Sequence, residues 1–79
     1  MRILSTPIKI ENIHISAAKN RKVIEENLTE ASKNDYKSAR HFKRGNYEKA
    51  AYYAILAQEH LRIASQVKRE DIKLHAMYN

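Results

Sequence analysis

A line of positive charge is the feature of this sequence best suited to chemistry with a partner. Lys33, Lys37, Arg40 and Arg44 follow one another at spacings of four, three and four residues. On a helix this spacing places the four side chains on one face, where like charges repel and an anionic partner would relieve the repulsion. We therefore predict these residues as a candidate site for an anion or nucleic acid. A solvated charged face is the alternative that needs no partner.

The charge of the whole chain is compatible with such a partner. Fifteen Lys and Arg residues outnumber nine Asp and Glu residues, which gives a formal net charge of +6. The segment from Lys33 to Lys49 holds six of the basic residues and two acidic ones, so it carries +4 of that charge. This balance permits nucleic acid, an acidic protein or an anionic membrane surface as partner, and it requires none of them.

Patterns for metal or cofactor chemistry are weak. Glu11 and His14 form one carboxylate–histidine pair at helical spacing, whereas a di-iron bundle needs two such pairs and further carboxylates. The chain has no Cys, which excludes thiolate metal sites, and its single Gly excludes a Gly-rich phosphate loop. We expect no metal, no cofactor and no small-molecule substrate.

A second candidate for chemistry lies near the C-terminus. Arg69 is followed after five residues by His75, a spacing that resembles the motif of HEPN ribonucleases, which are small helical proteins of toxin systems. The resemblance implies that Arg69 would steady phosphate charge and that His75 would transfer a proton. We rank a HEPN-like ribonuclease below a non-enzymatic protein.

The composition indicates one helical domain. The chain has 79 residues, one Gly, one Pro and 43% hydrophobic residues, a combination that favours helices over a turn-rich sheet. A small secreted domain would usually contain disulfides, so the absence of Cys favours an intracellular setting. The N-terminus lacks a signal-peptide core, and the longest apolar run, Ala50 to Ala57, is shorter than the roughly 18 residues of a membrane span. We expect a cytoplasmic protein.

Capping residues divide the chain into an arm and helices. We predict an extended arm over 1–15 and a helical domain over 16–79, with Ser16 as the first cap. Helices are expected at about 16–33, 36–44 and 47–76, and the first two could instead form one helix bent near Asn34. Gly45 and Asn46 tolerate the left-handed backbone that closes a helix. The predicted fold class is all-α, an antiparallel helical hairpin or a three-helix bundle with an extended N-terminal arm.

The arm is defined by isoleucines that alternate with polar residues, namely Ile8, Ile10, Ile13 and Ile15. Alternation favours an extended chain. Three interpretations stay open: an arm laid over the helices, an early start of the first helix, and a strand that pairs with a partner.

The segment GNYEKAAYYAILA, which follows the basic line, resembles the turn and second helix of a tetratricopeptide hairpin. Its matching residues are Gly45, Tyr47, Ala50, Tyr53 and Ala57. Microtubule-interacting-and-trafficking domains show a similar run, which Leu61 extends. The resemblance covers about residues 42–64 and implies two helices that approach closely through Ala, with aromatic rings beside them. No second copy follows, so it implies a hairpin and not an array.

The apolar residues of the first and last helices fall on helical stripes. In the first helix, Ala17, Ile24, Leu28 and Ala31 share a face. In the last, one face holds Ala50, Tyr53, Ala57, Leu61 and Ala64, and an adjoining face holds Tyr52, Leu56, Ile63 and Val67. Because two apolar faces need two neighbours, we expect a non-enzymatic protein-interaction module with a protein partner or a homodimer. Nucleic-acid binding through the basic line is the alternative.

Overall fold

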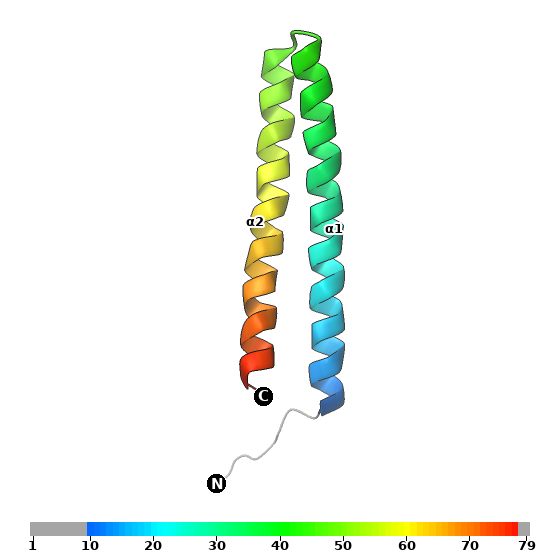
Figure 1. Cartoon of the computed structure of the whole chain (residues 1–79), viewed down its shortest axis with the longest axis vertical. Helices are drawn as coiled ribbons and strands as arrows, with labels where there is room; N and C mark the ends of the chain where they lie inside the picture. Colours follow the sequence, from blue (N-terminus) through cyan, green and yellow to red (C-terminus); the bar gives the residue numbers. More distant parts are fainter. Residues whose placement is uncertain (1–9, 78–79) are drawn as a thin grey trace.

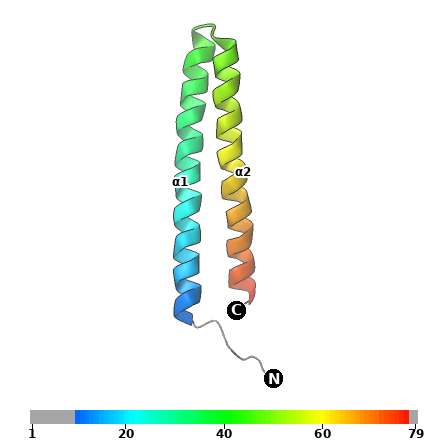
Figure 2. The ribbon, with the colours of Figure 1, turned by 180° about the vertical axis from the view of Figure 1, so that it is seen from behind.

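Two long antiparallel helices make up the part of the chain that the structure, a computed structural model, describes. It covers the backbone of residues 10–77 and the side chains of 15–77. Helix α1 spans Ile10–Lys43 and helix α2 spans Tyr47–Met77. They lie side by side along their lengths, with the turn at one end and the start of α1 beside the end of α2 at the other (Figures 1 and 2). The prediction of an all-α helical hairpin is confirmed, and no third helix is found over 10–77, so the three-helix bundle is not supported.

Helix α1 is continuous where the sequence suggests a boundary. Residues 10–15, predicted as the end of an extended arm, are helical, and residues 1–9 lie outside the described part. The expected helices 16–33 and 36–44 are parts of one helix, α1, which ends at Lys43, in line with the alternative of a single helix. Asn34 does not break the helix, because its side-chain Nδ2 donates to the Glu30 carbonyl at 2.8 Å and the side chain packs inside the hairpin, only 7% exposed.

The turn between the helices is closed by Gly45. Its φ of 83° is left-handed, a conformation that costs any other residue type except Asn or Asp about 1–2 kcal/mol. The Gly45 amide donates to the Phe42 carbonyl at 3.0 Å and the Asn46 amide donates to the His41 carbonyl at 2.8 Å. This pair of hydrogen bonds is a Schellman motif. The Asn46 carbonyl then accepts from the Ala50 amide at 3.0 Å, which starts α2.

The contact between the helices follows a seven-residue repeat. Such a repeat is typical of helix pairs that stay in contact over many turns. On α1 the inward residues, buried or half-buried, are Ala17, Asn20, Ile24, Asn27, Ala31, Asn34, Ser38 and His41, with Glu30 half-buried beside them. On α2 they are Ala50, Tyr53, Ala57, His60, Ala64, Val67, Asp71 and Leu74, with Leu56 and Ile63 half-buried beside them.

The core that results is thin. Its buried apolar residues are four alanines, Ala31, Ala50, Ala57 and Ala64, and no large side chain is fully buried among the described residues. Alanine allows the two helix axes to approach closely, but each buried alanine removes little apolar surface from water. Two helices of about 51 and 46 Å therefore depend on a narrow strip of contact.

Candidate functional site

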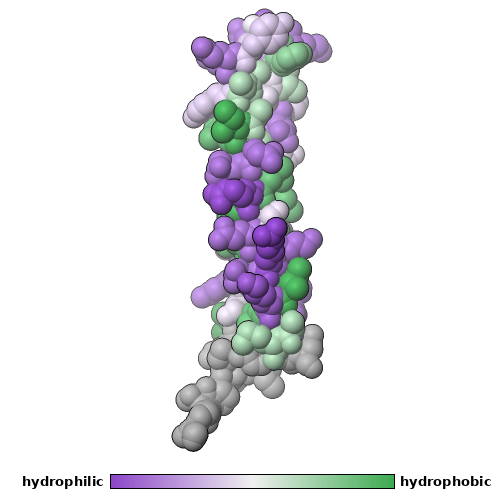
Figure 3. Space-filling model, turned by 90° about the vertical axis from the view of Figure 1, so that its left-hand side faces the viewer, coloured by the Kyte–Doolittle hydropathy of each residue, from purple (hydrophilic) through white to green (hydrophobic). Residues whose placement is uncertain are grey.

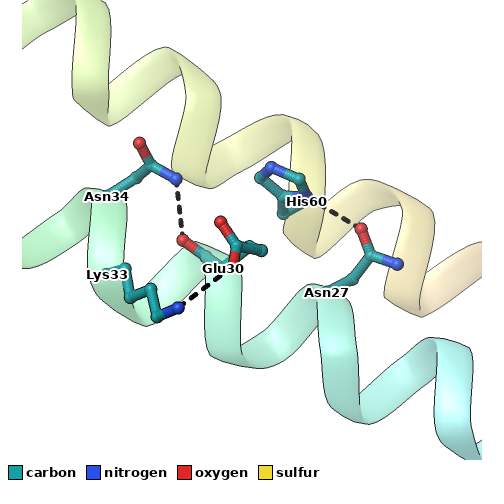
Figure 4. A network of polar contacts seen from close by, with 5 residues as sticks. All are labelled: Asn27, Glu30, Lys33, Asn34 and His60. Carbon is teal, nitrogen blue, oxygen red and sulfur yellow. Dashed lines mark hydrogen bonds and ion pairs between the residues drawn. The ribbon is translucent and has the colours of Figure 1, made fainter.

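Polar side chains occupy much of the strip between the helices. Asn27 Oδ1 lies 2.8 Å from His60 Nδ1, which connects α1 to α2 midway along the hairpin. Figure 4 shows this pair beside the Asn34–Glu30 hydrogen bond and the Lys33–Glu30 ion pair. A half-buried polar pair fixes which residues lie opposite one another, because sliding one helix would leave both groups without partners.

Further contacts of this kind lie toward both ends of the hairpin. Asn20 Nδ2 donates to Asp71 Oδ1 at 3.3 Å, and the Ser38 hydroxyl donates to the Ala50 carbonyl at 2.6 Å. Near the turn, the His41 ring stacks on the Tyr53 ring with centroids 5.4 Å apart. His41 Nδ1 is buried and has no hydrogen-bond partner among the described residues.

A signal in the sequence matches this arrangement. Asn20, Asn27, Asn34 and His41 recur at intervals of seven residues, and so do Ala50, Ala57 and Ala64. The stripes predicted from the sequence follow apolar residues only, so they place Leu28 on the inner face of α1 and do not include Asn34. In the structure Leu28 is exposed beside the strip and Asn34 lies within it.

One side of the hairpin carries most of the apolar residues that flank the strip, and we call it the apolar side. Leu28 and Phe42 each follow an inward residue of α1, and Ala54 and Leu61 each follow an inward residue of α2. The set comprises Ala18, Leu28, Ala39 and Phe42 on α1 and Tyr47, Ala51, Ala54, Leu61 and Ile72 on α2.

Two contacts show that these positions of the two helices meet on the same side. The rings of Phe42 and Tyr47 touch edge to face, with centroids 5.1 Å apart. At the far end, Ala18, Arg21 and His75 line one hollow. The large members of the apolar side, Leu28, Phe42, Tyr47, Leu61 and Ile72, are between 37% and 65% exposed. Figure 3, which faces the outer side of α2, shows hydrophobic side chains between hydrophilic ones on that face.

Charges on the apolar side are balanced. The charged residues interspersed at the same helical positions are Arg21, Glu25, Asp35 and Lys68, two of each sign. The net charge of +6 therefore resides elsewhere on the molecule, and it would not prevent two copies from meeting through this side.

The basic line predicted from the sequence lies away from the apolar side. Lys33, Lys37, Arg40 and Arg44 are all exposed, and Lys37 lies about 140–180° around α1 from Leu28 and Phe42. Lys37, Arg40 and Arg44 line a hollow of about 210 Å³ together with His41 and Tyr53. Three of the four predicted residues are thus brought together, while Lys33 pairs with Glu30 at 3.4 Å.

Aromatic rings border these cations. Lys37 Nζ lies 5.4 Å from the centre of the Tyr53 ring, and the Arg40 guanidinium lies 5.8 Å from the centre of the Tyr36 ring. The rings of Tyr52 and Tyr53 pack edge to face, with centroids 5.2 Å apart. Within residues 15–77, no carboxylate forms an ion pair with Lys37, Arg40 or Arg44. The structure therefore provides a cationic hollow with rings on both flanks; we call Lys37, Arg40, Arg44, Tyr36, Tyr52 and Tyr53 the basic side.

The ribonuclease candidates Arg69 and His75 are not brought together. Arg69 lines a hollow on the outer face of α2 with Arg62 and Lys73, whereas His75 lies 3.5 Å from Asp71 and lines the hollow beside Ala18. Next to the first of these hollows, the hydrogen bond from Arg62 lowers the pKa of Glu59 below its ordinary value. Both partners are exposed, so this pair contributes little to stability.

Two further expectations concern metal and membrane. No group of three or more His, Asp or Glu residues capable of holding a metal ion is found in the described part. Glu11 and His14 belong to α1, but their side chains lie outside that part. Over residues 10–77, neither helix contains a stretch long and apolar enough to cross a bilayer.

Comparison with known proteins finds no relative. No protein-family model matches the chain, and neither the curated proteins nor the solved structures yield a match. The hairpin is compatible with the resemblance to tetratricopeptide and microtubule-interacting-and-trafficking hairpins, and no family match supports either assignment. The surfaces of the hairpin are therefore the basis on which a function can be inferred.

Proposed function

We propose that this protein is a non-enzymatic interaction module that pairs with a second copy of itself through the apolar side. The proposal rests on the difference between the apolar side chains that the hairpin buries and those that it leaves exposed. The hairpin buries four alanines and leaves Leu28, Phe42, Tyr47 and Leu61 substantially exposed on one side. Fully burying a large apolar side chain contributes about 1.5–3 kcal/mol, so a partner that covers these four side chains would add hydrophobic stabilisation that a single hairpin lacks.

Pairing of two hairpins would supply the missing half of the core. Each helix would then contact its own partner in the hairpin and helices of the second copy, which gives a four-helix arrangement with a conventional core. A two-helix chain of this size rarely reaches useful stability alone, and oligomerisation is a common remedy.

A second copy fits the apolar side better than a charged partner does. The side carries two positive and two negative residues, so a copy of itself meets no net like charge there. The unbalanced cations, Lys37, Arg40 and Arg44, lie on the other side and would stay in solvent. Two-fold pairing through one self-complementary face is the commonest form of oligomer.

Unfolding at different protein concentrations tests the proposal. If the folded form is a dimer, each tenfold rise in protein concentration should stabilise it by about 1.4 kcal/mol per mole of dimer. We therefore expect the thermal midpoint, followed by circular dichroism at 222 nm, to rise steadily between low- and high-micromolar protein. A midpoint that does not move with concentration would contradict self-association.

A further inference from the structure

We propose that the basic side binds single-stranded nucleic acid. In this assignment Lys37, Arg40 and Arg44 hold backbone phosphates, and Tyr36 and Tyr52 stack with bases. This function is separate from self-association, because it uses residues on the other side of the hairpin.

The phosphate contacts rest on the hollow near the turn. Three cations line it, and among residues 15–77 none of them is neutralised by a carboxylate. Two of them already lie against rings, Lys37 on Tyr53 and Arg40 on Tyr36, which restrains long side chains that would otherwise lose conformational freedom on binding. The helix dipole favours a cation in the last turn of α1, such as Arg40, but it gives no reason for aromatic rings beside the cations.

The exposed rings favour a single strand over a duplex. Tyr36 is 66% exposed and Tyr52 is 58% exposed, on opposite flanks of the cations. Unpaired bases stack on aromatic side chains next to a cationic groove, whereas a duplex hides the faces of its bases. Lipid headgroups or an acidic protein would use the cations and leave the rings without a role.

Fluorescence anisotropy with labelled oligo-dT and oligo-U of 20 nucleotides tests the assignment in the full chain. Three phosphate contacts predict that log K falls with log salt with a slope of roughly −2, since each contact with a single strand contributes about 0.7. Lys37→Gln with Arg40→Gln should weaken binding and reduce the slope by roughly 1.4. Lys22→Gln with Lys73→Gln removes the same charge from exposed positions at the end of the hairpin far from the turn, outside the apolar side, and should change the slope little.

A second pair of variants separates stacking from charge. Tyr36→Ala should weaken binding by about five- to a hundredfold at fixed salt, and Tyr36→Phe should restore it, because the ring and not the hydroxyl stacks. The proposal is overturned by an absence of binding at low salt. It is equally overturned by a duplex of the same length that binds as tightly as the single strand, or by equal losses in the two charge variants. Light scattering on the same samples reports self-association separately, so failure of one proposal is distinguishable from failure of the other.

Discussion

Replacing Ala57 by leucine is expected to destabilise the hairpin strongly, because this alanine is the most deeply buried residue between the two helices. Ala57 is 1% exposed in the first half of α2, on the face that packs against α1. Leucine fits a helix nearly as well as alanine, so the penalty arises from the larger side chain between two closely packed backbones. Overpacking of this kind costs about 1–3 kcal/mol, which corresponds to a midpoint roughly 5–20 °C lower for a chain of this size.

The matched control is Gln66→Leu. Gln66 is exposed on the same helix and faces away from the apolar side, and Gln and Leu have similar helix propensities. Thermal unfolding by circular dichroism should leave this variant within a few degrees of the wild type. If Ala57→Leu and Gln66→Leu unfold at the same temperature, the two helices do not pack through the alanine repeat.

The second large effect is expected from charges on the apolar side. Leu28→Glu combined with Leu61→Glu places four carboxylates in the proposed interface of a dimer. At about 1 kcal/mol for the burial lost at each position, the four changes weaken association by about 4 kcal/mol. That is about a thousandfold in Kd. We expect the variant to sediment as a monomer at micromolar concentration, with a lower midpoint, because the single hairpin keeps only its thin core.

The control for this variant adds the same charge elsewhere. Tyr36→Glu with Gln66→Glu also introduces two carboxylates per chain, at exposed positions away from the apolar side. It should remain a dimer. Equal dissociation of both variants would show that net charge, and not the apolar side, governs association.

The turn and the helical class could be predicted from the sequence because they depend on local chemistry. A lone Gly followed by Asn is a strong local signal for the end of a helix, and Gly45 closes α1 with a left-handed φ. The continuity of α1 could not be predicted, because Asn34 and Asp35 are as suitable for a cap as for a helix interior. Tertiary packing keeps the helix continuous here, because the Asn34 side chain is buried between the helices and donates a hydrogen bond to the Glu30 carbonyl.

The surfaces were predictable only in part. The spacing of Lys37, Arg40 and Arg44 is sufficient to predict that they lie together, but Tyr53 joins their hollow from the other helix, and no local pattern shows that. The apolar side could not be predicted from the sequence for a similar reason. Leu28 and Leu61 each fit an inward stripe, and they flank the strip only because polar residues, Asn27 and His60, occupy the centre.

The mass of the wild-type protein in solution is the most direct test of self-association through the apolar side. Multi-angle light scattering behind size exclusion, at protein concentrations in the tens of micromolar, should give twice the chain mass of 9.2 kDa. The Leu28→Glu and Leu61→Glu double variant should give the mass of one chain under the same conditions. A wild-type mass of 9.2 kDa, with the helical circular dichroism of two intact helices, would contradict self-association.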